Sequence, residues 1–147
     1  MANPAVLHKI LTIREKEKND AQKEQISARK YFEKVATQLY EALKTKEKAE
    51  ETLQNYLKTK AAIEKIKEQS IYIDTLNRNI HTLQIKVQPA RQEMENKQKI
   101  LTEAHIEMKK IENMIERREK EQKELNEKLQ MNLMDEISIR QFQTQNR

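Results

Sequence analysis

The sequence has no glycine, no cysteine and no tryptophan, and it contains only two prolines, four tyrosines and two phenylalanines in 147 residues. Sharp turns depend on glycine, proline and asparagine for their special backbone angles, so this chain makes few of them. The shortage of aromatic side chains removes the residues that dominate most globular cores. The absence of cysteine excludes disulfides, thiolate metal sites and thiol nucleophiles. Together these absences argue against a compact globular domain.

Long hydrophobic runs are missing as well. No stretch approaches the roughly 18 consecutive apolar residues that a membrane-spanning helix needs. The N-terminus lacks the basic and apolar regions of a secretory signal. The net charge of +5 comes from 29 basic and 24 acidic residues that are interleaved along the chain, which favours a solvated mixed-charge surface over a nucleic-acid-binding stripe. We therefore expect a cytoplasmic protein with no nucleic-acid partner and no direct membrane insertion.

The sequence does contain a helical repeat. Its composition is typical of long coiled helices, with 36% charged residues. In the second half, seam positions recur at alternating steps of four and three residues over about seven heptads, which is the signature of a left-handed coiled coil. The seam positions are Leu76, Ile80, Leu83, Val87, Ala90, Met94, Lys97, Leu101, Ala104, Met108, Ile111, Ile115, Arg118, Gln122, Leu125 and Leu129.

The first half carries a less regular repeat. Asn3 is a good N-cap, and Pro4 suits the first turn of a helix. The steps between positions 24, 28 and 32 are two fours in a row, which predicts a local stutter in the heptad. The predicted seam positions are Val6, Ile10, Ile13, Glu17, Ala21, Glu24, Ala28, Phe32, Val35, Leu39, Ala42, Lys46, Ala49, Leu53 and Tyr56.

Periodicity is lost between the two repeats, which places a turn there. A short connection makes two long helices antiparallel neighbours. We predict an all-α fold, a two-stranded antiparallel coiled coil that forms a single domain over residues 1–147. Its helices cover about residues 4–58 and 63–142, with the turn at about residues 59–62. Pro89 should bend the second helix, because proline lacks a backbone N–H and its ring clashes with the preceding turn.

A turn centred near residue 61 also sets the pairing of the helices. Leu39 then faces Leu83, and Glu24 lies near Lys97. An opposite-charge pair on an apolar seam can fix the register of two helices. The alternative is that both charged side chains reach out to solvent.

The same pairing places Pro4 near Arg118 and leaves the rest of the second helix without an intramolecular partner. This overhang remains apolar along one side, and an uncovered apolar stripe indicates a partner protein. Fraying at the chain end is the alternative. The stripe consists of Leu125, Leu129, Leu133, Met134 and Ile137.

Residues that carry catalysis or hold metals are not grouped in the sequence. The histidines His8, His81 and His105 are far apart, and the chain has no glycine-rich loop to bind phosphate. A two-stranded coil also has no cleft that excludes water. We therefore expect no enzyme activity, no cofactor and no metal.

A group of apolar and aromatic residues lies beside the seam near the predicted turn. Tyr40 and Leu43 flank the seam of the first helix, and Tyr72 and Ile73 lie near the start of the second. Such residues need no explanation singly. As a group they predict either a docking site for a partner or additional core packing around the turn.

Two stretches resemble the flagellar FliJ family, small coiled-coil proteins of the bacterial flagellar type III export apparatus. Residues 134–142 contain a Met-Asp-Glu core that recurs in the family. Residues 69–76 open the second helix with a glutamine, an aromatic residue and a leucine, as in the family. Length and layout agree over the whole chain, but relatives often have a glycine and a capping serine at the turn. The matching residues are Met134, Asp135, Glu136, Gln69, Tyr72 and Leu76.

The resemblance implies a stalk without enzyme activity. In this family the paired terminal end inserts into the ring of the export ATPase hexamer and promotes ring assembly. The implied contacts there are Val6, Ile10, Ile13, Leu125, Leu129, Leu133, Met134, Asp135, Glu136 and Ile137.

The other end, in the family, contacts the cytoplasmic domain of the export-gate membrane protein. Export chaperones are bound and recycled as well, and the implied location is the cytoplasmic face of the cell membrane at the flagellar base. Two of the matching positions, Ala42 and Asn79, depart in residue type. The implied gate contacts are Gln38, Ala42, Tyr72, Leu76 and Asn79, with Tyr40 and Leu43 beside them.

Two other functions compete with this interpretation. One is a homo-oligomeric structural coiled-coil scaffold with no export role, which would form a stable long parallel dimer. The other is a basic nucleic-acid binder, whose binding would fall steeply with salt.

Overall fold

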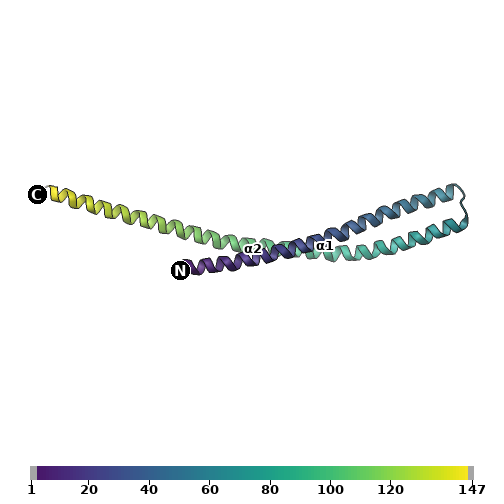
Figure 1. Ribbon diagram of the computed structural model, residues 1–147, viewed down its shortest axis with the longest axis horizontal. Coiled ribbons are helices and arrows are strands. Elements are labelled where there is room, and N and C mark those ends of the chain that lie inside the picture. Colours follow the sequence, from purple (N-terminus) through teal and green to yellow (C-terminus); the bar gives the residue numbers. More distant parts are fainter. Residues whose placement is uncertain (1–2, 146–147) are drawn as a thin grey trace. The chain divides into compact units, whose positions relative to one another are not determined.

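The computed structural model describes residues 3–145, and within them the chain forms two helices and no strand. Helix α1 covers Pro4–Lys58 and helix α2 covers Ile63–Gln145, so α2 continues three residues beyond its predicted end. The two helices pack against each other in opposite directions, which confirms the predicted antiparallel coiled coil (Figure 1). Neither helix contains, among the described residues, a segment with the length and apolar character needed to cross a membrane.

The chain divides into two compact units, and both helices contribute to each. Residues 20–102 form one unit, which contains the connection between the helices. Residues 1–19 and 103–147 form the other. That the whole chain acts as a single domain stays a prediction.

The start of α1 is fixed by Asn3. Its side-chain oxygen accepts a hydrogen bond from the backbone N–H of Ala5 at 3.2 Å. Its backbone carbonyl accepts bonds from Val6 and Leu7 at 2.9 and 3.1 Å. Asn3 therefore satisfies donors that the first turn of a helix otherwise leaves unpaired, and this confirms it as the N-cap.

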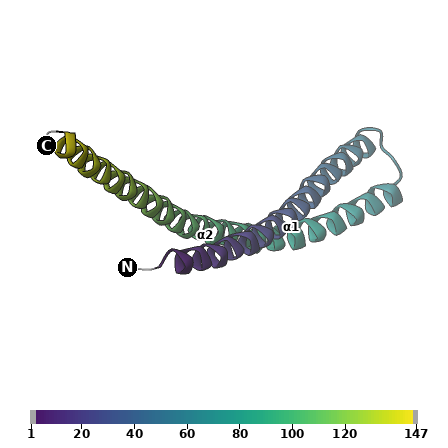
Figure 2. The same ribbon diagram turned by 60° about the vertical axis from the view of Figure 1, so that its left-hand side comes forward.

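The connection between the helices occupies residues 59–62, and both views show it joining the last turn of α1 to the first turn of α2 (Figures 1 and 2). Lys60 has a φ angle of 52°, in the left-handed region. The N–H of Ala61 reaches back to the carbonyl of Tyr56 at 2.9 Å. This is the bond of a Schellman cap, with lysine at the position that usually holds glycine. The chain turns without glycine, at the cost of crowding the Cβ of Lys60 against the backbone.

The core of the unit formed by residues 20–102 lies midway along the paired helices. Val35, Ala42, Ile80, Leu83 and Val87 form one buried cluster, against which Phe32 and Leu39 pack. These residues occupy the predicted seams of both helices. The spacing of alternate three and four residues therefore brings them to one face, as in a coiled coil.

Pro89 lies between two buried residues of this seam, Val87 and Ala90, and α2 continues through it as a helix. Packing of the flanking side chains against α1 offsets the hydrogen bond that proline cannot donate. The bend near Pro89 stays a prediction.

A polar contact ties the helices together near the turn. The side-chain amide of Gln69 donates a hydrogen bond to the backbone carbonyl of Ala49 at 2.9 Å. Ala49 is buried, so its small side chain lets α2 approach the backbone of α1. A hydrogen bond from one helix to the backbone of the other depends on the relative position of both, and it therefore contributes to their register.

The predicted seam of α1 is wrong at Val6, Ile13 and Glu17, which are exposed, whereas the predicted seam residue Ala21 is buried. Val6 and Ile13 are about half exposed, at 46% and 55%, whereas Leu7 is only 3% exposed. Counting back from the buried Ala21 by alternating steps of three and four gives positions 18, 14, 11 and 7, and all four are partly or fully buried. The sequence has apolar residues at neighbouring positions, such as Val6 and Leu7, so two different rows were possible. A helix rotates by about 100° per residue, and only one of these rows can face α2.

The stutter predicted near residue 24 is also absent from the seam. Gln25, not Glu24, occupies the buried position, with 9% of its surface exposed. With Gln25 on the seam, α1 alternates steps of four and three without a break from Leu7 to Tyr56. Several of these positions are polar, and Arg14 and Lys18 are half-buried there, as long charged side chains can be when their charged ends reach solvent.

The predicted pair of Glu24 and Lys97 is in contact. The Nζ atom of Lys97 lies 3.1 Å from Glu24 across the two helices and 3.7 Å from Glu93 on its own helix. The side chain of Glu24 is 59% exposed and that of Lys97 is 27% exposed, so this is a bridge at the edge of the seam and not a buried layer. The hydrogen bond to Glu24 raises the pKa of Lys97, with a smaller contribution from Glu93.

Replacement of Lys60 by glycine should stabilise the fold. Glycine adopts a positive φ angle without the crowding that a Cβ causes, and the gain is partly offset by its greater freedom in the unfolded chain. We expect an increase of about 0.5–1 kcal/mol in the free energy of unfolding, or a rise of a few degrees in Tm, by thermal denaturation. The matched control is Lys60→Ala, which keeps the Cβ and should leave Tm unchanged. An equal gain in both variants would mean that the left-handed backbone is not the cause.

The pair of Glu24 and Lys97 should contribute a small, salt-sensitive coupling to stability. In a double-mutant cycle of Glu24→Gln and Lys97→Gln, the double variant should be more stable than the sum of the single changes predicts. Because the folded pKa of Lys97 is raised, the contribution is complete below the ordinary lysine pKa of 10.5 and is lost as pH rises through the higher folded value.

The control for this cycle is the pair of Arg29 and Glu33, whose atoms lie 3.8 Å apart within α1. It cannot report on contacts between the helices. Additive effects of the Glu24 and Lys97 substitutions at low salt would remove the proposed contribution to register.

Candidate interaction surfaces

In the unit formed by residues 1–19 and 103–147, the start of α1 covers only part of α2. Leu7 and Met108 are buried there, at 3% and 8% exposure. Arg118 is the last half-buried residue of α2, and every described residue from 119 to 145 is exposed. The predicted overhang is therefore present as helix, within the described residues, and the start of α1 lies beside Arg118 as the pairing predicted.

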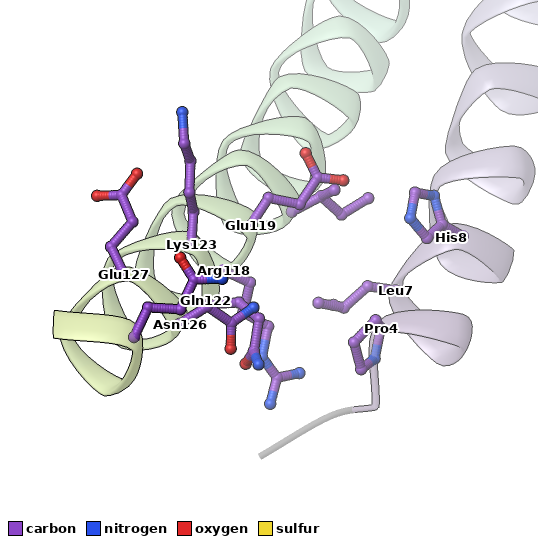
Figure 3. A pocket seen from close by; sticks show the side chains of 11 residues that line it. Pro4, Leu7, His8, Arg118, Glu119, Gln122, Lys123, Asn126 and Glu127 are labelled. Atoms are coloured by element: carbon purple, nitrogen blue, oxygen red, sulfur yellow. The ribbon is translucent and has the colours of Figure 1, made fainter. Parts of the chain in front are cut away.

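A groove marks the place where α2 loses its partner. Figure 3 shows Pro4 and Leu7 of α1 facing Arg118 and Gln122 of α2. Gln122 is the first seam position of α2 that lies beyond the cover of α1, because it is exposed whereas Arg118 is half-buried. The groove is lined by Pro4, Leu7, His8, Ile115, Arg118, Glu119, Gln122, Lys123, Asn126, Glu127 and Gln130.

The overhang exposes a regular row of aliphatic side chains. Leu125, Leu129, Leu133 and Ile137 follow one another at steps of four, with 52%, 57%, 58% and 46% of their surfaces exposed. A step of four advances about 40° around the helix each time, so this row winds away from the heptad seam of residues 76–118. A partner that covers the whole row must therefore follow this winding.

The apolar surface of the overhang is wider than the predicted stripe. Met134 is 69% exposed and lies on the side of the helix opposite Leu125. Met131, Ile139 and Phe142 are also more than half exposed, and the sequence interpretation did not include them among the contacts. The spacing of these residues could have revealed them, since at about 100° per residue their side chains surround the helix between residues 131 and 142. Asp135 and Glu136 lie in the same turn and are exposed.

The first turns of α1 expose further apolar side chains. Val6 and Ile13 lie about two turns apart on one side of the helix, and Ile10 lies between them, half-buried. Because they lie beside the seam and not on it, their surfaces remain accessible to another protein. The three predicted contacts of α1 are therefore close together.

A hollow between α1 and α2 unites four of the predicted gate contacts. Gln38 and Ala42 of α1 and Leu76 and Asn79 of α2 line it together. Ala42 is buried and Leu76 half-buried, so they form its apolar floor, whereas Gln38 and Asn79 are exposed.

The sequence interpretation missed several residues of this hollow. Glu41 and Thr45 lie one and two turns from Gln38, and Lys86 lies two turns from Asn79, so helical spacing pointed to them. The carboxylate of Glu41 and the ammonium group of Lys86 therefore lie beside the apolar floor. A partner that fits this hollow would have a small apolar group surrounded by polar groups.

The aromatic group near the turn is divided by the structure. Tyr40, Leu43 and Tyr72 are 59%, 44% and 44% exposed, which fits a docking site, whereas Ile73 is half-buried on the seam. Tyr72 lines a second hollow with Tyr56, Lys65, Glu68 and Gln69. Tyr40 and Leu43 line neither hollow, and the Nζ atom of Lys44 lies 5.0 Å from the ring centre of Tyr40.

Metal-ligating side chains do not gather in the described part of the chain. Within residues 3–145, no group of three histidine, aspartate or glutamate side chains has the geometry to hold a metal ion.

Comparison with known proteins identifies the family. The model of the flagellar FliJ protein family matches residues 4–147. The flagellar FliJ protein of Bacillus subtilis (strain 168) is 34% identical over 145 residues, which cover 99% of both chains. No solved structure matches the chain significantly. Because the family model and this relative both match nearly the whole chain, the chain belongs to the flagellar FliJ family, whose members are components of the flagellar export apparatus.

Proposed function

We propose that this protein is a stalk that connects the export ATPase to the export gate, and that it has no enzyme activity of its own. The overhang of α2 enters the ring of the ATPase hexamer and promotes ring assembly. The hollow lined by Gln38, Ala42, Leu76 and Asn79, together with Tyr72, contacts the cytoplasmic domain of the gate membrane protein. The protein also binds and recycles export chaperones, and in this way it supports flagellum assembly and hence motility and chemotaxis.

The observation that carries this proposal is the uncovered apolar surface of the overhang. Residues 119–145 form a helix without a partner among the described residues, yet they present large apolar side chains to solvent. When another protein covers these side chains, the free energy falls, because apolar surface leaves contact with water. The spread of apolar side chains around residues 131–142 favours a partner that surrounds the helix, as a ring does, over a partner that lies along one side.

The gate contact is supported by the composition of the hollow. Ala42 and Leu76 supply a small apolar floor, and the exposed Tyr72 lies one turn before Leu76 on α2. Tyrosine is enriched among the residues that dominate binding energy at interfaces. Tyr40 and Leu43 extend the apolar surface on α1, and we include them in the contact.

This function places the protein in the cytoplasm, held at the membrane face of the flagellar base through its partners. The scaffold alternative lacks an export role and is set aside, because the chain belongs to an export family. An alternative to the ring contact is that the overhangs of two copies of this chain pair with each other, since the apolar row is exposed in each copy. This alternative can be measured.

The proposed ring contact predicts that the protein stimulates ATP hydrolysis by the cognate ATPase. A variant with Leu125, Leu129, Leu133 and Ile137 changed to glutamine should lose most of this stimulation, because four exposed apolar side chains are removed. The helix should remain folded, since glutamine is a good helix former and none of these residues is buried. Phosphate release and circular dichroism measure the two properties.

The matched control changes Glu121, Lys123, Glu124 and Lys128 to glutamine in the same segment, which removes charge and keeps the apolar row. Stimulation should persist in this variant. Full stimulation by the apolar-row variant, or by a chain that lacks residues 125–147, would contradict the proposal. A stable dimer of the wild-type chain in light scattering, abolished by the same changes, would instead indicate pairing of two overhangs.

The proposed gate contact predicts a specific role for Tyr72. Tyr72→Ala should weaken binding to the purified gate domain about tenfold, as for a moderate hot-spot residue. Tyr31→Ala is the matched control, since Tyr31 is 53% exposed and lines neither hollow. Both variants should keep the wild-type Tm, because each removes an exposed side chain. Equal effects of the two substitutions in calorimetry would argue against a contact at Tyr72.

A further inference from the structure

The connection between the helices exposes more apolar surface than a polar turn would. Ile63, the first residue of α2, is 81% exposed, which makes it more exposed than any other large apolar residue among those described. Leu57, in the last turn of α1, is 58% exposed. Neither belongs to the hollows near the turn. They are the apolar part of a surface that we call the turn tip, residues 57–67.

The turn tip is also basic. Lys58, Lys60, Lys65 and Lys67 are all exposed, and Glu64 is the one acidic residue among these eleven, so the net charge is +3. None of the four lysines forms an ion pair within residues 3–145. Elsewhere among the described residues, seven close ion pairs join six lysine or arginine residues to glutamate.

We infer that the turn tip binds directly to the surface of an anionic lipid bilayer. Free lysines are attracted to negatively charged headgroups, while exposed aliphatic side chains enter the boundary between headgroups and acyl chains. The short connection suits this contact, because it presents both kinds of side chain within a few residues of each other. The tip does not span the bilayer, so the binding is weak and reversible.

This inference deepens the proposed location at the membrane face and rests on that part of the proposed function. It adds a contact with lipid to the contacts with proteins. Leu76, on the floor of the gate hollow, lies 13 residues along α2 from Ile63, or about 20 Å at the helical rise. A tip held at the headgroups therefore presents the hollow to a gate domain a short distance from the bilayer. Each contact increases the local concentration for the other.

The charge complementarity favours lipid over an acidic protein surface. An acidic protein would need only the lysines, and Ile63 would remain uncovered and uninvolved. A bilayer engages both, since its surface charge and its apolar interior lie within one side-chain length. The two partners are distinguished by experiment, because only the bilayer binds the purified chain in the absence of other proteins.

The test measures binding of the purified full-length chain to vesicles by sedimentation. Vesicles of phosphatidylcholine with about one third phosphatidylglycerol should bind the protein, and pure phosphatidylcholine should bind it far less. The variant Lys58→Glu with Lys60→Glu should bind at least about twentyfold more weakly, because each lysine near the surface contributes about fivefold. Ile63→Ser should weaken binding about fivefold and keep the salt dependence.

The matched control is Lys23→Glu with Lys30→Glu, which causes the same change in net charge on exposed residues of α1 away from the tip. It should retain most of the vesicle binding. Equal binding to both kinds of vesicle, or equal losses in the tip and control variants, would overturn the inference. Lost binding of the tip variant to the gate domain, with vesicle binding unchanged, would assign the tip to an acidic protein instead.

The assay contains neither ATPase nor gate protein. Failure of vesicle binding therefore leaves stimulation of the ATPase and binding of the gate domain to be judged by their own measurements. Failure of those measurements leaves the lipid contact standing.

Discussion

Side chains that recur at steps of three and four hold α1 against α2, and the buried cluster of residues 20–102 consists of them. Every other feature depends on this seam. It is narrow, and much of it is alanine, so the helices bury few large side chains. The pairing of α1 and α2 is stabilised by many small contacts along the seam. These contacts form together only if the heptad spacing is kept.

A narrow seam leaves most of each helix in contact with solvent. Exposed apolar residues are common on any protein surface, so their presence alone decides little. Their grouping is more informative. The row from Leu125 to Ile137, the hollow above Ala42 and Leu76, and the tip around Ile63 each combine apolar groups with a defined polar environment. Each lies where the geometry of two helices leaves a surface open: past the start of α1, between the helices, and at their connection.

The polar residues near the seam have different roles from those suggested by their charges. Glu24 and Lys97 form a bridge at the edge of the seam, and Gln25 takes the buried position. Gln69 reaches the backbone of Ala49, which explains a glutamine at the start of α2 in structural terms. Lys60 adopts the left-handed backbone that helix caps usually place at glycine, and the Schellman cap forms nonetheless. Polar contacts thus contribute to register at several places.

The sequence by itself determined the helical class, the antiparallel pairing, the N-cap at Asn3 and the overhang, because periodicity and chain length are properties of the chain alone. It also placed Gln38, Ala42, Leu76 and Asn79 together through a family resemblance, and the structure brings them around one hollow. Only tertiary structure decided which of Val6 and Leu7 faces α2 and whether Glu24 or Gln25 is buried. Neighbouring residues on a helix differ by about 100° in direction, and the choice between them depends on the second helix. Likewise, only the structure showed that Leu57 and Ile63 are exposed beside the lysines of the tip, because burial at a turn depends on how the backbone closes it.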